Sequence, residues 1–363
     1  MGSQSFQTRI ARQFPPNYRE EIVPRVLGLI AKGESCFIVG ASGVGKSNFF
    51  RFLWNEETQA RYLTDADKTF VFIWADTNGL AGELSAFYVY ELVLYNLQKW
   101  VEDNPGLGAA PDFFRELHEK VVIHKDRVLA QRHLETALRH LFNQIDNLHV
   151  VLLFDEFEPI VRELDFQFFR SLRWLRDEFK YHLSYVMAAH RSPIAIREEF
   201  FDAGEPLYEL LAANIMGLKP YNPADSEFMV AELSTRYEVA LSDSKKEIVL
   251  RLSGGHGGLI SAIFKILIKQ SLPRQAEAQV EQLLSFDSVA GECRKVWNSL
   301  ESVEQDVLVD LVKADFAPQQ RLPLNSLVAK GIILPDTAII TLFSPLFREF
   351  LRAVVPAMVD RRP

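Results

Sequence analysis

The stretch Gly40-Ala41-Ser42-Gly43-Val44-Gly45-Lys46-Ser47 decides the fold of this chain. It matches the pattern G-x-x-x-x-G-K-[ST] at every fixed position. The apolar residues 35–39 before it predict a buried strand, and residues 48–54 after it predict the first turns of a helix. A strand, a glycine turn and a helix start form a cradle for phosphate, because glycines let successive backbone N–H groups point inward. The alternative is a glycine turn that binds nothing.

This loop predicts a nucleotide site with a magnesium ion. Lys46 would neutralise the β- and γ-phosphates, and the hydroxyl of Ser47 would hold Mg²⁺. We expect adenine as the base, because the closest text to a guanine-binding [NT]-K-x-D element, residues 312–315, lacks its first residue and lies in another domain. The residues expected to bind the nucleotide are Gly40, Ala41, Ser42, Gly43, Val44, Gly45, Lys46, Ser47, Asn48 and, from a second glycine-rich loop, His256.

The composition is that of an ordinary globular protein. A chain of 363 residues predicts two or three domains, and a hydrophobic fraction of 48% supports packed cores. The net charge of −8 argues against a nucleic-acid-binding surface over the whole molecule. Cys36 and Cys293 form no metal or redox motif, and no apolar run is long enough to span a membrane. Residues 1–14 lack the apolar centre of a signal peptide, so we expect a cytoplasmic protein without a membrane partner.

A second run of residues supplies carboxylates to the predicted site. Residues 150–154 are apolar without interruption, which predicts a strand buried on both faces of a parallel sheet. Asp155 and Glu156 follow at its carboxyl end, the edge at which open α/β sheets bind ligands. We expect Asp155 to belong to the Mg²⁺ shell and Glu156 to be the general base for the attacking water. The alternative is a solvated strand end.

Other charged residues nearby are less informative. Glu158 and Asp165 are expected to be surface carboxylates. Arg170, Arg173 and Arg176 recur every three residues on a predicted helix, where they could reach a phosphate of an adjacent subunit. Such arginines more often are solvated or pair locally.

A third apolar strand, residues 183–189, ends in His190-Arg191. In a doubly wound sheet this strand lies between the two nucleotide-binding strands, so its end is expected near the γ-phosphate. We favour Arg191 as the residue that senses this phosphate, because a guanidinium fork suits phosphate oxygens. The alternative is His190, which could instead satisfy a backbone group.

The rest of the chain predicts two further domains, so that the boundaries are 1–216, 217–275 and 276–363. Helical patterns at 224–237, 243–252 and 259–270 predict a small helical lid. Four glycines surround His256 there, so either two helices pack tightly or the loop contacts the nucleotide. Residues 276–363 predict three helices followed by a hairpin, with strand candidates at 332–334 and 338–342, and a final helix at 345–355. These elements describe a winged helix.

With these residues the chain resembles the STAND branch of the AAA+-like P-loop ATPases, which is related to archaeal-type ATPases and NB-ARC switches. The resemblance covers nearly the whole chain and rests on GASGVGKS at 40–47, VVLLFDEFE at 150–158, Ala189-His190-Arg191, SGGHGGLI at 253–260 and FSPLFREFL at 343–351. It implies an α/β fold with a parallel-sheet P-loop NTPase core of αβα type, a helical lid and a winged helix. Arg191 is similar to the family's γ-phosphate sensor, and SGGHGGLI is similar to its Gly-Gly-x-Pro segment beside the nucleotide.

The chain departs from this family at three places. SGGHGGLI lacks the proline, Ser344 stands near the place where many members have a histidine that locks the ADP state, and Tyr18-Arg19-Glu20 is the nearest text to the usual Gly-Arg-Glu. Members commonly carry an effector domain and a sensor repeat, for which this chain has no room. We therefore expect a protein partner or effector on a separate chain.

These features favour an ATP-dependent conformational switch. ATP and ADP would be its nucleotides, with Mg²⁺ as cofactor, and hydrolysis would be slow or stimulated by a partner. Lys46, Glu156 and Arg191 are the expected catalytic residues. Nucleotide turnover would control a partner protein or the assembly of copies of this chain.

Two alternatives remain open at this stage. A DNA-handling ATPase of the initiator or transposition type would share the core and the winged helix. Residues 276–363 hold nine Lys and Arg against twelve Asp and Glu, which makes nucleic acid the less expected partner. A nucleotide-binding scaffold without hydrolysis is disfavoured by the intact Lys46, Asp155 and Glu156.

Overall fold

The computed structural model describes residues 14–77, 84–202, 206–313, 321–334 and 341–359. The chain forms two compact units, of which the first comprises residues 1–38 and 47–215 and the second residues 39–46 and 216–363. The division therefore groups most of the glycine-rich stretch with the C-terminal residues, rather than with the residues that flank it in the sequence.

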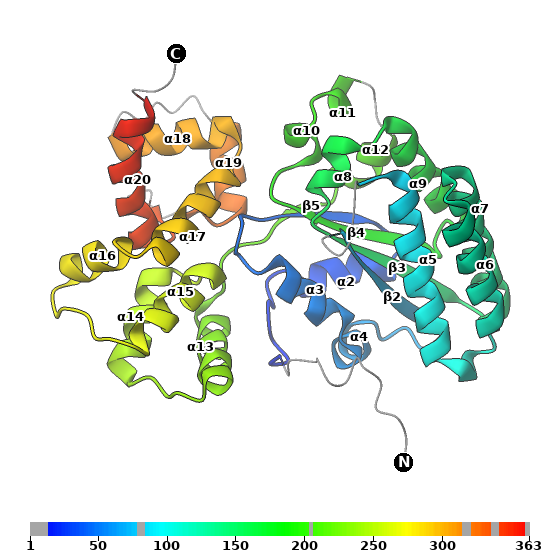
Figure 1. The fold of residues 1–363 in the computed structure, drawn as a ribbon, viewed down its shortest axis with the longest axis horizontal. Coiled ribbons are helices and arrows are strands. Elements are labelled where there is room, and N and C mark those ends of the chain that lie inside the picture. Colours follow the sequence, from blue (N-terminus) through cyan, green and yellow to red (C-terminus); the bar gives the residue numbers. More distant parts are fainter. Residues whose placement is uncertain (1–13, 78–83, 203–205, 314–320, 335–340, 360–363) are drawn as a thin grey trace. The chain divides into compact units, whose positions relative to one another are not determined.

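Within the described ranges, the first unit is built on a five-stranded sheet in the order β2-β3-β4-β1-β5 (Figure 1). The strands are β1 (Cys36–Val39), β2 (Thr69–Asp76), β3 (Leu148–Asp155), β4 (Leu183–Ala189) and β5 (Ile215–Gly217), and the last residues of β1 and β5 belong to the second unit. The pairings of β2 with β3 and of β3 with β4 are parallel. Every residue of β1, β3 and β4 is buried. The predicted α/β class is thus confirmed, and β4 lies between β3 and β1 as a doubly wound sheet requires.

Helices surround this sheet in the first unit. Helix α5 packs on β2, α6 and α7 pack on α5, and α9 packs on β4 (Figure 1). The helices are α2 (Val23–Ala31), α3 (Lys46–Trp54), α4 (Glu56–Tyr62), α5 (Ala86–Asp103), α6 (Pro111–His124), α7 (Arg127–Gln144), α8 (Glu158–Glu163), α9 (Phe166–Glu178), α10 (Pro193–Ile196), α11 (Glu199–Asp202) and α12 (Pro206–Ala212).

Helix α6 is an element that the sequence patterns above do not predict. A 3-10 turn (Pro105–Leu107) precedes it, and Pro111 is the first residue of α6. Proline suits this position because the first N–H of a helix has no intrahelical partner. Phe114, Leu117 and Val121 then recur at helical spacing and are buried.

The second unit is mainly helical. Helices α13 and α14 pack on α15, and α18 packs on α19, where Lys330 forms a buried ion pair with Glu304 at 2.7 Å. The elements are α13 (Pro223–Tyr237), α14 (Asp243–Ser253), α15 (Gly257–Leu267), α16 (Ala276–Leu284), α17 (Asp287–Asn298), α18 (Ser302–Lys313), α19 (Arg321–Ala329), β6 (Ile333–Leu334), β7 (Thr341–Leu342) and α20 (Pro345–Val359). Strands β6 and β7 pair antiparallel, as the predicted hairpin requires. The assignment of a lid and a winged helix stays a prediction.

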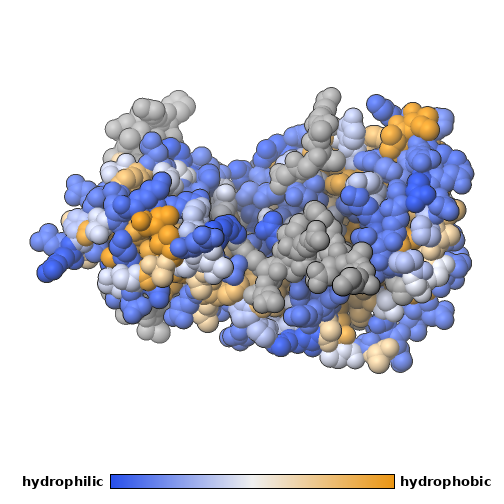
Figure 2. Space-filling model, turned by 60° about the horizontal axis from the view of Figure 1, so that its bottom comes forward, coloured by the Kyte–Doolittle hydropathy of each residue, from blue (hydrophilic) through white to orange (hydrophobic). Residues whose placement is uncertain are grey.

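The surface in Figure 2 is mostly hydrophilic, and its hydrophobic residues form small separate groups. The most exposed large hydrophobic side chains of the described residues include Ile123 at the end of α6 and Val128 at the start of α7, which are 74% and 63% exposed. Scattered apolar residues of this kind are normal on protein surfaces. Among the described helices, none combines the length and the apolar character needed to cross a bilayer.

Candidate functional site

The glycine-rich loop, which is predicted to be a phosphate cradle, follows β1. Gly43 and Gly45 have φ values of 78° and 105°, in the left-handed region that favours glycine. Gly40 is required for close packing, because a Cβ there would lie 3.0 Å from Val44 Cγ1 and 3.2 Å from Leu218 Cβ. Glycines in this conformation permit the backbone turns of a phosphate-binding loop.

The start of α3 continues this cradle. Lys46 is the first residue of α3 and is 5% exposed, and its ammonium donates a hydrogen bond to the carbonyl of Gly40 at 3.2 Å. Ser47 and Asn48 follow in the first turn, where backbone N–H groups lack intrahelical partners and favour anions. The side-chain oxygen of Asn48 accepts a hydrogen bond from Arg51 at 3.2 Å.

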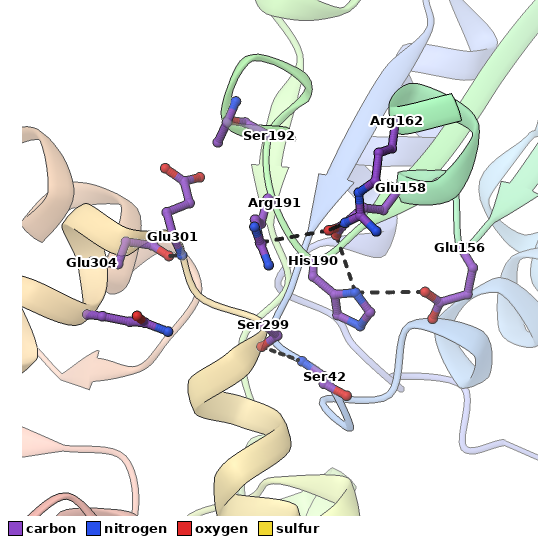
Figure 3. Close-up of polar contacts among 12 residues, drawn as sticks. Ser42, Glu156, Glu158, Arg162, His190, Arg191, Ser192, Ser299, Glu301 and Glu304 are labelled. Carbon is purple, nitrogen blue, oxygen red and sulfur yellow. Dashed lines mark hydrogen bonds and ion pairs between the residues drawn. The ribbon is translucent and has the colours of Figure 1, made fainter. Parts of the chain in front are cut away.

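Three hydrogen bonds from the C-terminal residues of the second unit hold this loop. The N–H of Ser42 donates to the hydroxyl of Ser299 at 3.0 Å, and the ring of His256 donates to the carbonyl of Ser42 at 2.8 Å (Figure 3 shows the first of these). The N–H of Gly258 donates to the carbonyl of Gly43 at 3.0 Å. The conformation of the loop is therefore tied to the segments that begin α15 and follow α17.

His256 is fully buried at the N-cap of α15. The N–H of Leu259 donates to Nδ1 of His256 at 3.3 Å, so Nδ1 acts as an acceptor and Nε2 carries the proton that bonds Ser42. Both ring nitrogens are thus engaged with protein groups. The expectation that His256 binds the nucleotide stays a prediction.

The glycines around His256 are needed for close packing of the backbone. A Cβ at Gly254 would overlap the carbonyl of Phe343, one at Gly255 would overlap the carbonyl of Tyr221, and one at Gly258 would overlap the carboxylate of Glu292. Tyr221 and Phe343 lie outside helices, so the choice between two packed helices and a nucleotide contact stays a prediction.

The carboxyl edge of the sheet lies in the first unit and carries the predicted acids. Asp76 and Asp155 are register partners at the ends of β2 and β3, and Asp155 is 1% exposed. The N–H of Glu156 donates to Oδ1 of Asp155 at 3.1 Å. Glu156 has a φ of 51°, unusual for a residue with a side chain, and the hydroxyl of Thr77 donates to its carbonyl at 3.2 Å. Strained backbone of this kind often occurs at functional residues.

His190, the residue directly after β4, faces two carboxylates (Figure 3). Its Nδ1 is 3.8 Å from Oε2 of Glu156 and 3.5 Å from Oε2 of Glu158. Arg191 points to the same carboxylate, since its Nε is 3.8 Å from Oε1 of Glu158. The side chains of Glu156, His190 and Arg191 are between 23% and 31% exposed.

The expectation that Glu158 is a surface carboxylate is wrong. This residue is 6% exposed, and Arg162 donates to its Oε1 at 2.8 Å. Burial alone would raise the pKa of Glu158, but His190, Arg191 and Arg162 outweigh it and hold the pKa below its ordinary value.

Asp165 and two of the arginines of α9 have partners within the first unit. Asp165 has a side chain that is 57% exposed, and it accepts the N-cap hydrogen bond of α9. Arg173 pairs with Asp177 at 2.7 Å, and the buried Arg176 donates to the carbonyl of Gly33 at 3.1 Å. Arg173 thus pairs locally, as such arginines more often do, whereas Arg176 donates to a residue that is distant in the sequence.

The predicted site residues thus fall into two groups. Residues 40–46 and His256 belong to the second unit, and Ser47, Asn48, Asp155, Glu156 and Arg191 belong to the first. In the described part of the chain, no group of three or more His, Cys, Asp or Glu side chains has the arrangement of a metal site by itself. A magnesium site would have to use hydroxyl, backbone or ligand oxygens as well.

Comparisons with known proteins show which solved structures have a similar fold. No protein-family model and no curated protein sequence matches the chain. A Walker-type ATPase of Pyrococcus abyssi is similar, with 15% identity and a TM-score of 0.53 over 94% of this chain and 99% of that one. The chain shares the fold of this ATPase.

Two further structures match at lower similarity. The Orc2 protein of Aeropyrum pernix has 13% identity and a TM-score of 0.48, over 94% of this chain and 93% of that one. Cdc6 from Pyrobaculum aerophilum has 14% identity and a TM-score of 0.41, over 99% of this chain and 97% of that one.

Sequence reasoning missed four residues that the structure adds to these groups. Thr77 and Glu158 lie at the carboxyl edge, and Ser299 and Glu292 lie against the loop. Thr77 directly follows an apolar strand, which is a usable signal. Ser299 and Glu292 belong to or follow α17, a helix that the patterns above do not predict, although Val289, Cys293, Val296 and Trp297 repeat at helical spacing.

Proposed function

We propose that this protein binds and hydrolyses ATP and acts as a conformational switch of the STAND or AAA+ type, controlling a partner protein or its own assembly. The observation that carries the proposal is the attachment of the loop 40–46 to His256, Gly258 and Ser299. A ligand that reorganises this loop must change the hydrogen bonds that it makes with those residues. A scaffold that merely holds a nucleotide has no need of such an attachment.

Each predicted residue has a role in this proposal. The N–H groups of residues 40–48 and the ammonium of Lys46 would bind the phosphates, because a positively polarised helix start and a lysine favour anions. Glu156 would orient and deprotonate the attacking water, and Arg191 would respond to the γ-phosphate. Asp155 and Ser47 supply the hard oxygen donors that Mg²⁺ prefers, and a bound ion would neutralise phosphate charge.

The experiment compares ATP binding and phosphate release in three variants. We expect Lys46→Ala to weaken binding of a fluorescent ATP analogue at least tenfold, because it removes the only ammonium within the loop 40–47. Ser299→Ala is expected to strengthen binding about fivefold, because the N–H of Ser42 no longer has to give up a hydrogen bond worth on the order of 1 kcal/mol before it binds phosphate. The matched control is Lys120→Ala, because the side chain of Lys120 lies on α6 and is 50% exposed. This variant should bind ATP like the wild type.

The outcomes separate the functions considered. Wild-type affinity in Lys46→Ala would remove the nucleotide site from this loop. Wild-type affinity in Ser299→Ala would leave the site but remove its proposed coupling to the C-terminal residues. Salt-sensitive binding of duplex DNA by the wild type would favour a DNA-handling ATPase instead, and binding without phosphate release, with partners present, would favour a scaffold.

A further inference from the structure

Glu158 contacts two successive residues of another element. Its Oε2 is 3.5 Å from Nδ1 of His190, and its Oε1 is 3.8 Å from Nε of Arg191 (Figure 3). Successive side chains of a strand point to opposite faces, so one carboxylate reaches both only because β4 has ended at Ala189. The chain then turns into α10, where the hydroxyl of Ser192 caps the helix.

His190 connects this carboxylate to a second one. Its Nδ1 lies between Oε2 of Glu158 and Oε2 of Glu156, at 3.5 and 3.8 Å. Glu158 is the more buried of the two carboxylates, with its side chain 8% exposed against 25% for Glu156. The buried carboxylate of Glu158 is therefore held in place by the protein, and the more exposed carboxylate of Glu156 can face a ligand.

We propose that Glu158 is a positioning residue, which holds His190 against Glu156 and so fixes the carboxylate that activates water. The inference rests on the proposed hydrolysis at this edge of the sheet. Glu158 touches no reacting group in this scheme, since it acts through His190. Under this proposal His190, like Arg191, contributes to the hydrolysis site at the carboxyl end of β4.

A purely structural role is the competing explanation. Arg162 makes the shortest ion pair to Glu158, at 2.8 Å, and it lies four residues along the same helix. If Glu158 served only to pair with Arg162, removing either partner would have the same consequences. If it positions His190, only removal of Glu158 would impair turnover.

The test measures kcat, KM and nucleotide affinity for ATP in Glu158→Gln, His190→Gln, the double variant and the control Arg162→Gln, with thermal unfolding of each. We expect Glu158→Gln to lower kcat at least tenfold while the nucleotide Kd changes less than threefold. We expect the double variant to be no slower than the slower single variant, because residues that act through one another are not additive. Arg162→Gln should retain the wild-type kcat.

Other results would overturn the inference. Wild-type kcat in Glu158→Gln, or effects of Glu158→Gln and His190→Gln that multiply in the double variant, would remove the positioning role while leaving ATP hydrolysis intact. A wild-type protein that releases no phosphate would overturn the proposed function and this role with it. If Glu158→Gln does not fold, Glu158→Asp retains the charge but withdraws the carboxylate by one methylene, and it should likewise lower kcat at least tenfold.

Discussion

The amino and carboxyl edges of the central sheet each hold a histidine, and the two histidines differ in burial and in hydrogen bonding. At the amino edge, His149 of β3 is 2% exposed, its Nδ1 donates to the carbonyl of Tyr181 at 2.7 Å, and its Nε2 accepts from the hydroxyl of Ser184 at 2.9 Å. At the carboxyl edge, His190 has a side chain that is 23% exposed and lies 3.5 and 3.8 Å from two carboxylates.

This difference separates groups that serve folding from groups that are available for chemistry. Burial lowers the pKa of His149 to about 4, and both of its ring nitrogens have good hydrogen bonds, so this side chain stays neutral and fixed. The carboxylates around His190 lie beyond good hydrogen-bond distance from it, and Glu156 has a strained backbone. The exposed parts of His190 and Glu156 can therefore meet a ligand, while the buried Glu158 stays in place beside them.

The largest expected effect belongs to the carboxyl edge. We predict that Glu156→Gln lowers the kcat of ATP hydrolysis by about 10²- to 10⁴-fold, the usual contribution of a general base. Nucleotide affinity should change less than threefold, because the amide has nearly the same size as the carboxylate. Phosphate release at saturating ATP measures the effect, and His149→Gln at the amino edge is the control that should keep the wild-type kcat. Comparable losses in both variants would mean that the two edges do not differ in function.

Strands β1, β3 and β4 and the two segments expected to carry catalytic residues were accessible from the sequence because their signals are local. Continuous apolar runs predict β3 and β4, and the acids and His190-Arg191 directly follow them. The contacts of Glu158 were not accessible, because they depend on how the turn after β3 approaches the end of β4. Nothing in the text DEFE distinguishes a carboxylate that faces solvent from one that faces an imidazole on another strand.

The second glycine-rich segment illustrates the same limit. The glycines around His256 correctly indicated close backbone approach, but the partners of that approach, Tyr221 and Phe343, are distant in the sequence. The role of Ser299 depends on α17, whose helical stripe of Val289, Cys293 and Val296 contains only a few apolar residues among polar ones. Local pattern thus predicted which segments matter, whereas the pairing of those segments required the fold.

The next largest effect concerns the amino edge and depends on pH. The pKa of His149 is about 4 in the folded protein against 6.5 for an ordinary histidine, so the unfolded chain binds a proton first as the pH falls. The free energy of unfolding should therefore decrease between pH 6.5 and about pH 4, by up to about 3 kcal/mol from this residue. Below about pH 4 the folded protein is protonated as well, and this contribution ends.

Urea unfolding at pH 7.5, 5.5 and 4.5 measures this contribution by difference. His149→Gln retains an amide that can donate to Tyr181 but has no proton to bind, so other titrating groups cancel between the two proteins. We expect the stability of the wild type to fall more steeply than that of the variant between pH 6.5 and 4.5. Parallel curves for the two proteins would show that His149 is not held neutral by its burial and its hydrogen bonds.

The smallest effect tests whether the carboxyl edge stores strain at Glu156. Both Glu156→Gln and Glu156→Gly remove the carboxylate, but only glycine adopts a φ of 51° without strain. The left-handed conformation costs a residue with a side chain roughly 1–2 kcal/mol, part of which is offset by the larger entropy that glycine has when unfolded. We therefore expect Glu156→Gly to be more stable than Glu156→Gln by about 1 kcal/mol in urea unfolding, while both variants hydrolyse ATP far more slowly than the wild type. Equal stabilities would mean that the hydrogen bonds from Thr77 and to Asp155 already offset the backbone strain at this position. The carboxyl edge would then differ from the amino edge in its side chains alone.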